Sequence, residues 1–175
     1  TIDGNGGIGA VIRVWKNKEF PELPRFGIRF FLKKELENIT YYGMGPMESY
    51  CDKHRAASHG LYRARVEEMH EDYIRPQENG SHYDCDYVEL TNGQYGIAAA
   101  SETPFSFNAS PYTQEELERA EHNDQLRKSD STVLCLDYAM NGIGSNSCGP
   151  KTWKPYRFDD VEFTFALRLV PFVKG

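Results

Sequence analysis

The sequence has few of the features that mark membrane, redox or nucleic-acid proteins. No apolar run approaches the roughly 20 residues that a bilayer-spanning helix needs, and residues 1–7 do not form a signal peptide. The four cysteines contain no Cys-x-x-Cys pair, so neither a zinc ribbon nor a dithiol redox site is indicated, and free thiols are favoured. Lys and Arg number 20 against 26 Asp and Glu, and the net charge of -6 disfavours phosphate backbones and acidic lipids. We therefore expect neither nucleic acid nor a membrane as a partner.

The distribution of apolar residues predicts an all-β fold. At 175 residues the chain has the size of a single domain covering residues 1–175. Residues of β-strand character, mostly alternating apolar and polar, predict strands at 8–15, 25–32, 39–44, 83–90, 95–100, 105–109, 132–138 and 161–170. Residues 45–76 show no sustained period and are expected to be mostly loop. One short helix is predicted from a capping box of Thr113 and Glu116 to about His122, so an antiparallel β-sandwich is favoured.

Acidic pairs offer candidates for glycosidase chemistry, which needs two carboxyls about 5 Å apart in a retaining enzyme. Such pairs are Glu48 with Asp52, Glu67 with Glu68, and Asp84 with Asp86. Their abundance favours a structural interpretation, in which Asp84 and Asp86 share one exposed or hydrogen-bonded strand face.

Metal and nucleophile motifs are weak. The histidines at 54, 59, 70, 82 and 122 lack the spacing of a metal site and are expected to be surface residues or loop anchors, so we predict no metal. Gly142-Ile143-Gly144 is not followed by the helix that a dinucleotide fingerprint requires. Cys148 has no placed histidine beside it and is expected to be a small loop residue rather than a nucleophile.

Four sequence blocks carry a family resemblance. They are Leu23-Pro24-Arg25-Phe26-Gly27, the run from Tyr41 to Asp52 that contains Gly45-Pro46-Met47-Glu48, Pro76-Gln77-Glu78-Asn79-Gly80, and the loop Gly142 to Pro150. Their order and spacing resemble the C-terminal small-chain domain of the β-galactosidases of glycoside hydrolase family 2, and the likeness covers nearly the whole chain.

The resemblance implies a galactose mutarotase-like antiparallel supersandwich, here the larger C-terminal part of the domain and truncated at its N-terminus. The family's catalytic glutamates lie in a preceding (β/α)₈ barrel, so no catalytic residue is expected in this chain. The loop Gly142 to Pro150 is implied to line the sugar pocket, with Asn146, Ser147 and Cys148 as substrate-binding residues. The best-known members carry an aromatic residue that packs on the sugar where Cys148 stands here, so weaker stacking is expected unless Trp153 substitutes. No cofactor is expected in this chain, since the Mg and Na ions of many members lie in other domains.

The remaining block residues are expected to serve the scaffold or interdomain contacts: Arg25, Glu48, Asp52, Glu78 and Asn79. We expect Glu48 and Asp52 to hold neighbouring backbone amides, or Arg25 and Arg55, and Glu78-Asn79-Gly80 to form a turn.

The leading functional hypothesis is a non-catalytic accessory domain of a β-galactosidase. Its expected partners are a β-galactoside bound through the parent enzyme and the barrel and other domains of the same chain, and a bacterial cytoplasmic location is favoured. Sheet edges exposed by truncation would also favour a homo-oligomer. The alternatives are a stand-alone carbohydrate-binding module, suggested by the aromatic content, and a mutarotase-like sugar epimerase, suggested by fold analogy.

Overall fold

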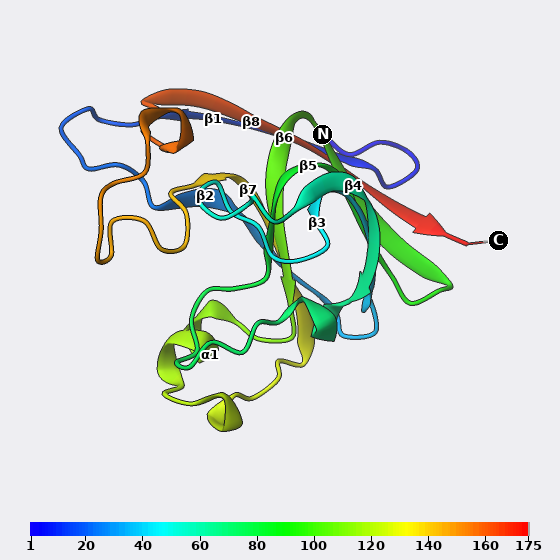
Figure 1. Ribbon diagram of the computed structural model, residues 1–175. Coiled ribbons are helices and arrows are strands. Elements are labelled where there is room, and N and C mark those ends of the chain that lie inside the picture. Colours follow the sequence, from blue (N-terminus) through cyan, green and yellow to red (C-terminus); the bar gives the residue numbers. More distant parts are fainter. Residues whose placement is uncertain (175) are drawn as a thin grey trace.

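The computed structural model describes residues 1–174, which form mainly antiparallel strands (Figure 1). The strands are β1 (Ile8–Trp15), β2 (Arg25–Lys33), β3 (Asn38–Gly45), β4 (Ser58–Arg65), β5 (Ser81–Thr91), β6 (Tyr95–Ser110), β7 (Ser131–Met140) and β8 (Glu162–Val173). The short helix α1 covers Gln114–Arg119, and single 3₁₀ turns lie at Val66–Met69, Asn123–Gln125 and Lys154–Tyr156. The all-β sandwich prediction is confirmed. Among the described residues, no helix has the length and apolar character needed to cross a membrane.

The long strand β6 organises the sheet. All eight strands belong to one sheet, whose main path runs β1-β8-β6-β5-β3-β4. The first part of β6 pairs with β8, while its last part pairs with β7, which in turn pairs with β2. The two arms, β1-β8 and β2-β7, therefore separate from a common strand and lie one over the other (Figure 1).

Aromatic side chains fill the space between the two arms. Phe163 of β8 stacks on Tyr138 of β7 with ring centroids 4.4 Å apart, and it meets Phe26 of β2 edge-on at 5.0 Å. Phe165, Leu167 and Leu169 continue the same buried face of β8, as their alternation predicts. This core rigidly joins the ends of β2, β7 and β8, from which the loops of the candidate site emerge.

Two strand predictions are corrected by the structure. The region expected to be mostly loop contains β4, which pairs with β3 along its whole length. Its alternation was obscured because small or aromatic residues face inward while Leu61 is 60% exposed. Residues 95–100 and 105–109 form one strand, β6, rather than two. Pro104 is tolerated there because β6 changes partner between Ala100 and Ser106, so no ladder bond to β8 or β7 is lost.

Local geometry differs from the prediction at the helix and in β5. Thr113 caps α1 by accepting a hydrogen bond from the backbone N–H of Glu116 at 3.1 Å. The Glu116 carboxylate, however, binds Arg119 and the N–H of Arg127 instead of completing the capping box, and the helix ends at Arg119 rather than His122. In β5 the strict alternation is broken by irregularities around Cys85, where Asp84 has a φ of +55°.

Candidate functional site

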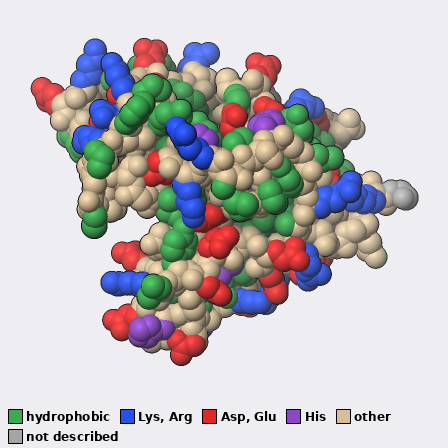
Figure 2. Space-filling view, viewed as in Figure 1, with side chains coloured by type: hydrophobic (Ala, Val, Ile, Leu, Met, Phe, Trp, Pro, Cys, Tyr) green, Lys and Arg blue, Asp and Glu red, His purple; other side chains and the backbone are tan. Residues whose placement is uncertain are grey.

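An open cleft lies beside the Gly-rich loop. It has a volume of about 760 Å³ and lies between the 47–57 segment and residues 145–156. Figure 2 shows the surface indented between the part that carries the loop after β7 and the part that carries α1. Trp153 lines the cleft with 80% of its surface exposed, and Tyr156 also lines it. A broad exposed aromatic face in a cleft of this size is suited to an apolar or C–H-rich ligand surface.

Asp52 fixes the loop at one wall of this cleft. Its carboxylate accepts hydrogen bonds from three successive backbone N–H groups, those of Ile143 at 3.0 Å, Gly144 at 3.1 Å and Ser145 at 2.9 Å. Burial alone would raise the pKa of Asp52, but these three donors outweigh it and lower the pKa. A Cβ atom at Gly142, where φ is +84°, would lie 2.3 Å from the Asp52 carboxyl carbon. The close approach of loop and carboxylate therefore requires glycine at position 142.

Glu48, which lines the cleft, joins separate segments of the chain through hydrogen bonds. One carboxylate oxygen accepts hydrogen bonds from Lys53 and from the Tyr73 hydroxyl, and the other accepts one from the backbone N–H of Gly80 at 2.8 Å. Glu48 itself is buried. It thus connects the 46–53 segment to the turn before β5, across a long separation in sequence.

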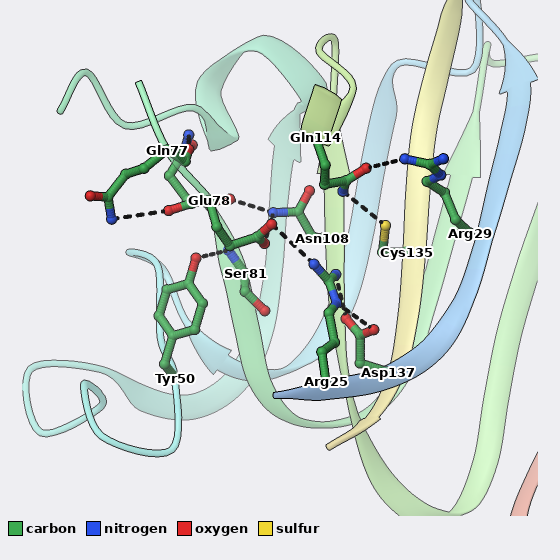
Figure 3. Close-up of polar contacts among 12 residues, drawn as sticks. Arg25, Arg29, Tyr50, Gln77, Glu78, Ser81, Asn108, Gln114, Cys135 and Asp137 are labelled. Atoms are coloured by element: carbon green, nitrogen blue, oxygen red, sulfur yellow. Dashed lines mark hydrogen bonds and ion pairs between the residues drawn. The ribbon is translucent and has the colours of Figure 1, made fainter. Parts of the chain in front are cut away.

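Arg25 forms a second polar cluster, drawn in Figure 3, on the β2-β7 arm. Its guanidinium binds both oxygens of Asp137, at 2.8 and 2.7 Å, and one oxygen of Glu78 at 3.0 Å. Asp137 is 2% exposed. Burial raises the pKa of both carboxyls against the pull of Arg25, while the two acids raise the pKa of the guanidinium despite its own desolvation. The cluster joins the 76–80 turn to the β2-β7 arm as a bidentate ion pair with a second acid attached.

The arrangement of this acidic pair differs from that of a glycosidase. A retaining enzyme needs one carboxylate free to attack and one protonated carboxyl facing the same bond. Both oxygens of Asp137 are engaged by Arg25, and Glu78 shares that guanidinium. The cluster is therefore arranged as a clamp.

The other acidic candidates are engaged in local contacts. Glu67 pairs with Lys128 at 2.8 Å, and Glu68 accepts a hydrogen bond from the backbone N–H of Arg65 at 2.7 Å. Asp86, which is exposed in β5, lies 3.8 Å from His59. These contacts agree with the structural interpretation of Glu67, Glu68 and Asp86, whereas the irregularity at Asp84 means that Asp84 and Asp86 do not follow the simple alternation expected of them.

The block residues contact distant parts of the chain, and their scaffold or interdomain role stays a prediction. Glu48 and Asp52 hold backbone amides as anticipated, although these amides are distant in sequence, and the charged partner is Lys53 rather than Arg25 or Arg55. Asn79 accepts a hydrogen bond from the N–H of Glu71 at 3.0 Å. Where the sequence predicted a turn at 78–80, the structure has a bend at Glu78, followed by Gly80 with a φ of +72°.

The three predicted substrate-binding residues lie at the exposed tip of the loop. Ser145 and Pro150 line the cleft, whereas Asn146 faces a neighbouring hollow, and the side chains of Ser147 and Cys148 are exposed. Their role in binding stays a prediction. Trp153, whose burial the sequence left open, lies on the surface of the cleft and not in the core.

Histidine and cysteine positions bear on the metal and redox expectations. His82 was expected at the surface or as a loop anchor, but it is buried between Tyr41 and Phe107, and burial lowers its pKa to about 4, so it is neutral. All four cysteines are free, and Cys148 is exposed. Within residues 1–174, no group of three or more His, Cys, Asp or Glu side chains is arranged to hold a metal ion.

The fold and the site define a class: an antiparallel β domain that presents an open aromatic cleft beside an anchored Gly-rich loop. The chain belongs to the beta galactosidase small chain family, which matches residues 1–169. It is 46% identical over 169 residues to a beta-galactosidase of Actinobacillus pleuropneumoniae and 39% identical over 171 residues to one of Staphylococcus xylosus. Each alignment covers 97% of this chain but only 16% and 17% of those relatives. A beta-galactosidase of Kluyveromyces lactis is 35% identical over 152 residues, which is 85% of this chain and 14% of the relative. The chain therefore spans about a sixth of the length of the first two relatives.

Proposed function

We propose that this chain is the accessory domain of a β-galactosidase that hydrolyses terminal β-D-galactose residues. It completes the sugar pocket from outside the catalytic centre, and the bond-breaking carboxyls belong to other parts of the parent protein. The observation that carries the proposal is the cleft of about 760 Å³ whose wall is the loop anchored by Asp52. Family membership supplies the substrate class.

The composition of the cleft supports a neutral sugar as its ligand. Three cations, Lys53, Arg55 and Lys151, and three acids, Glu48, Asp52 and Glu71, line it, so its formal charges balance. Polar groups that hydrogen-bond hydroxyls stand beside Trp153, whose face suits the C–H side of a pyranose. Trp153 thus supplies the stacking surface that Cys148 is too small to offer.

The state of the acidic side chains supports an inactive domain. Glu48 is occupied by Lys53, Tyr73 and Gly80, and Asp52 by three loop amides, so neither is free to act as a nucleophile. The roles left to the chain are shape, stacking and the exclusion of water. These raise the reactivity of carboxyls on another domain without forming bonds themselves.

Hydrolysis of a nitrophenyl β-galactoside tests the proposal directly. The purified chain is expected to release nitrophenol no faster than buffer does, whereas the parent protein turns over the substrate by the retaining mechanism. In the parent, Trp153→Ala is expected to raise KM more than it lowers kcat, with Trp15→Ala, a β1 residue that does not line the cleft, as the matched control. Turnover by the chain alone, or equal effects of the two Trp variants, would refute the proposal.

A stand-alone carbohydrate-binding module is favoured as the second candidate by the exposure of Trp153. Titration of the chain with lactose, followed by tryptophan fluorescence, separates the two. The accessory domain supplies only one wall and is expected to give a flat titration. Saturation below about millimolar sugar, lost in Trp153→Ala, would establish the module instead.

A further inference from the structure

A second hollow lies on the other side of the anchored loop. It has a volume of about 640 Å³ and is lined by the connection between β1 and β2 together with residues 141–161. Ser145, Lys151 and Thr152 line both this hollow and the cleft described above. The two sites therefore adjoin, with the loop as the wall between them, and Asn146 lies on the side of the second hollow.

The charge of this hollow is opposite to that of the whole chain. Four cationic side chains, Lys16, Lys18, Lys151 and Arg157, line it against two acids, Glu22 and Asp159, so its formal charge is +2 in a chain of net charge -6. Lys151 lies 3.6 Å from Glu22, which leaves three cations facing the remaining acid. A concave surface with an excess of one sign raises the local concentration of the opposite ion.

Two of these cations are held in place without being neutralised. The Lys16 ammonium donates hydrogen bonds to the carbonyl oxygens of Phe20 at 3.2 Å and Pro21 at 3.0 Å. The Nε of Arg157 donates one to the carbonyl of Thr152. Carbonyl acceptors fix the position of each group but leave its charge and its other N–H donors available. The groups are thus ordered before a ligand arrives, which lowers the entropic cost of binding.

We propose that this hollow binds the carboxylate or sulfate group of an acidic saccharide whose neutral galactose residue lies in the adjoining cleft. The proposal rests on the proposed function for the cleft, but the anion site is formed by this chain's own residues. It assigns Lys16, Lys18, Lys151 and Arg157 to the recognition of the anion, and Asn146 to hydrogen bonding of its oxygens. The preferred galactosides of the parent are accordingly those with an anionic neighbouring unit.

Titration of the ¹⁵N-labelled chain with three probes at constant ionic strength tests this. Sodium sulfate and lactobionate, a galactosyl gluconate, are expected to give saturable shifts of the amides of Lys18, Asn146 and Arg157. Lactose is expected to leave those amides unchanged. Lactobionate is expected to bind several-fold more tightly than gluconate because its galactose residue reaches the cleft. Added sodium chloride should weaken the binding of all the anions.

The variant Lys18→Gln/Lys151→Gln keeps the groups whose carbonyl bonds order the hollow. It is expected to weaken the binding of sulfate and lactobionate by roughly tenfold, as two partly solvated charges are removed. Arg63→Gln/Arg13→Gln, which removes two exposed charges from β4 and β1, is the matched control and should change neither.

Each alternative outcome overturns a defined part of the proposal. Amide shifts that do not saturate with added sulfate, or that occur at residues outside the hollow, refute the anion site. Saturable sulfate binding with lactobionate no tighter than gluconate refutes the acidic saccharide as its ligand. Hydrolysis of nitrophenyl galactoside by the chain would refute the proposed function of the cleft. This activity is measured separately from the sulfate titration, so the two proposals can fail independently.

Discussion

Replacing Asp52 by Asn is expected to release the loop Gly142 to Pro150 while leaving the sandwich folded. The carboxylate accepts three amide hydrogen bonds, one on Oδ1 and two on Oδ2. Asn offers a single acceptor oxygen, and its NH₂ group cannot accept. If that oxygen keeps its hydrogen bonds from the N–H groups of Gly144 and Ser145, the NH₂ group faces the N–H of Ile143. Both groups are donors, so no hydrogen bond forms between them.

The magnitude follows from the bonds that change. A hydrogen bond to a charged group contributes about 1.5–3 kcal/mol and a neutral one about 0.5–1.5 kcal/mol. One bond is lost and two lose their charge, which would amount to about 5 kcal/mol at a dry site. Asp52 is only half-buried, so solvent screening reduces the expected cost to about 2 kcal/mol, or roughly thirtyfold in the opening equilibrium of the loop.

Hydrogen exchange at the three anchored amides measures this equilibrium. Protection of Ile143, Gly144 and Ser145 is expected to fall by roughly thirtyfold in Asp52→Asn, with the buried β7 amides of Leu134 and Leu136 unchanged. Asp124→Asn, an exposed aspartate near α1, is the matched control. Unchanged protection of the loop, or an equal loss throughout β7, would show that Asp52 is not its anchor.

The same anchor has a defined dependence on pH. Because the folded pKa of Asp52 is lowered, its contribution is complete above the ordinary value of about 3.9 and is lost as the pH falls through the folded pKa. Protection, corrected for intrinsic exchange, is therefore expected to stay constant from about pH 7 to 5 and to decline only below about pH 4. A decline of this protection near neutral pH would show that a group other than Asp52 anchors the loop.

Three further outcomes are expected. Arg25→Gln leaves the buried Asp137 and the half-buried Glu78 without their cation and should cost about 3–5 kcal/mol in urea unfolding. Glu78→Gln keeps the bidentate pair and should cost under about 1 kcal/mol, so equal costs would contradict the clamp. Gly142→Ala should match Asp52→Asn in hydrogen exchange, because its Cβ would meet that carboxyl. Gly144→Ala, whose Cβ would have no atom within 4 Å, should keep the anchor, and equal loss of protection in both variants would contradict the close approach at Gly142. A thiol reagent should modify Cys148 rapidly and the three buried cysteines only on unfolding, and a second fast thiol would show that the core opens.

The sequence alone determined the β-rich class and most strand positions, because period-2 alternation is a local property of the chain. The buried face of β8 and the Thr113 cap are confirmed for this reason. Strand β4 escaped detection because its inward positions are small and Leu61 faces outward. The single strand β6 escaped because only its change of partners explains how Pro104 is accommodated.

The loop, its glycines and the block residues were likewise evident in the sequence, but their partners were decided only by tertiary structure. Asp52 lies 91 residues before Ile143, and Arg25 lies 112 residues before Asp137. No local pattern encodes such pairs, since they arise when β6 directs two arms of one sheet over each other and brings distant loops to the same end. The charge of the hollow beside the loop has the same origin: Lys16 and Arg157 become neighbours only because β1 pairs with β8.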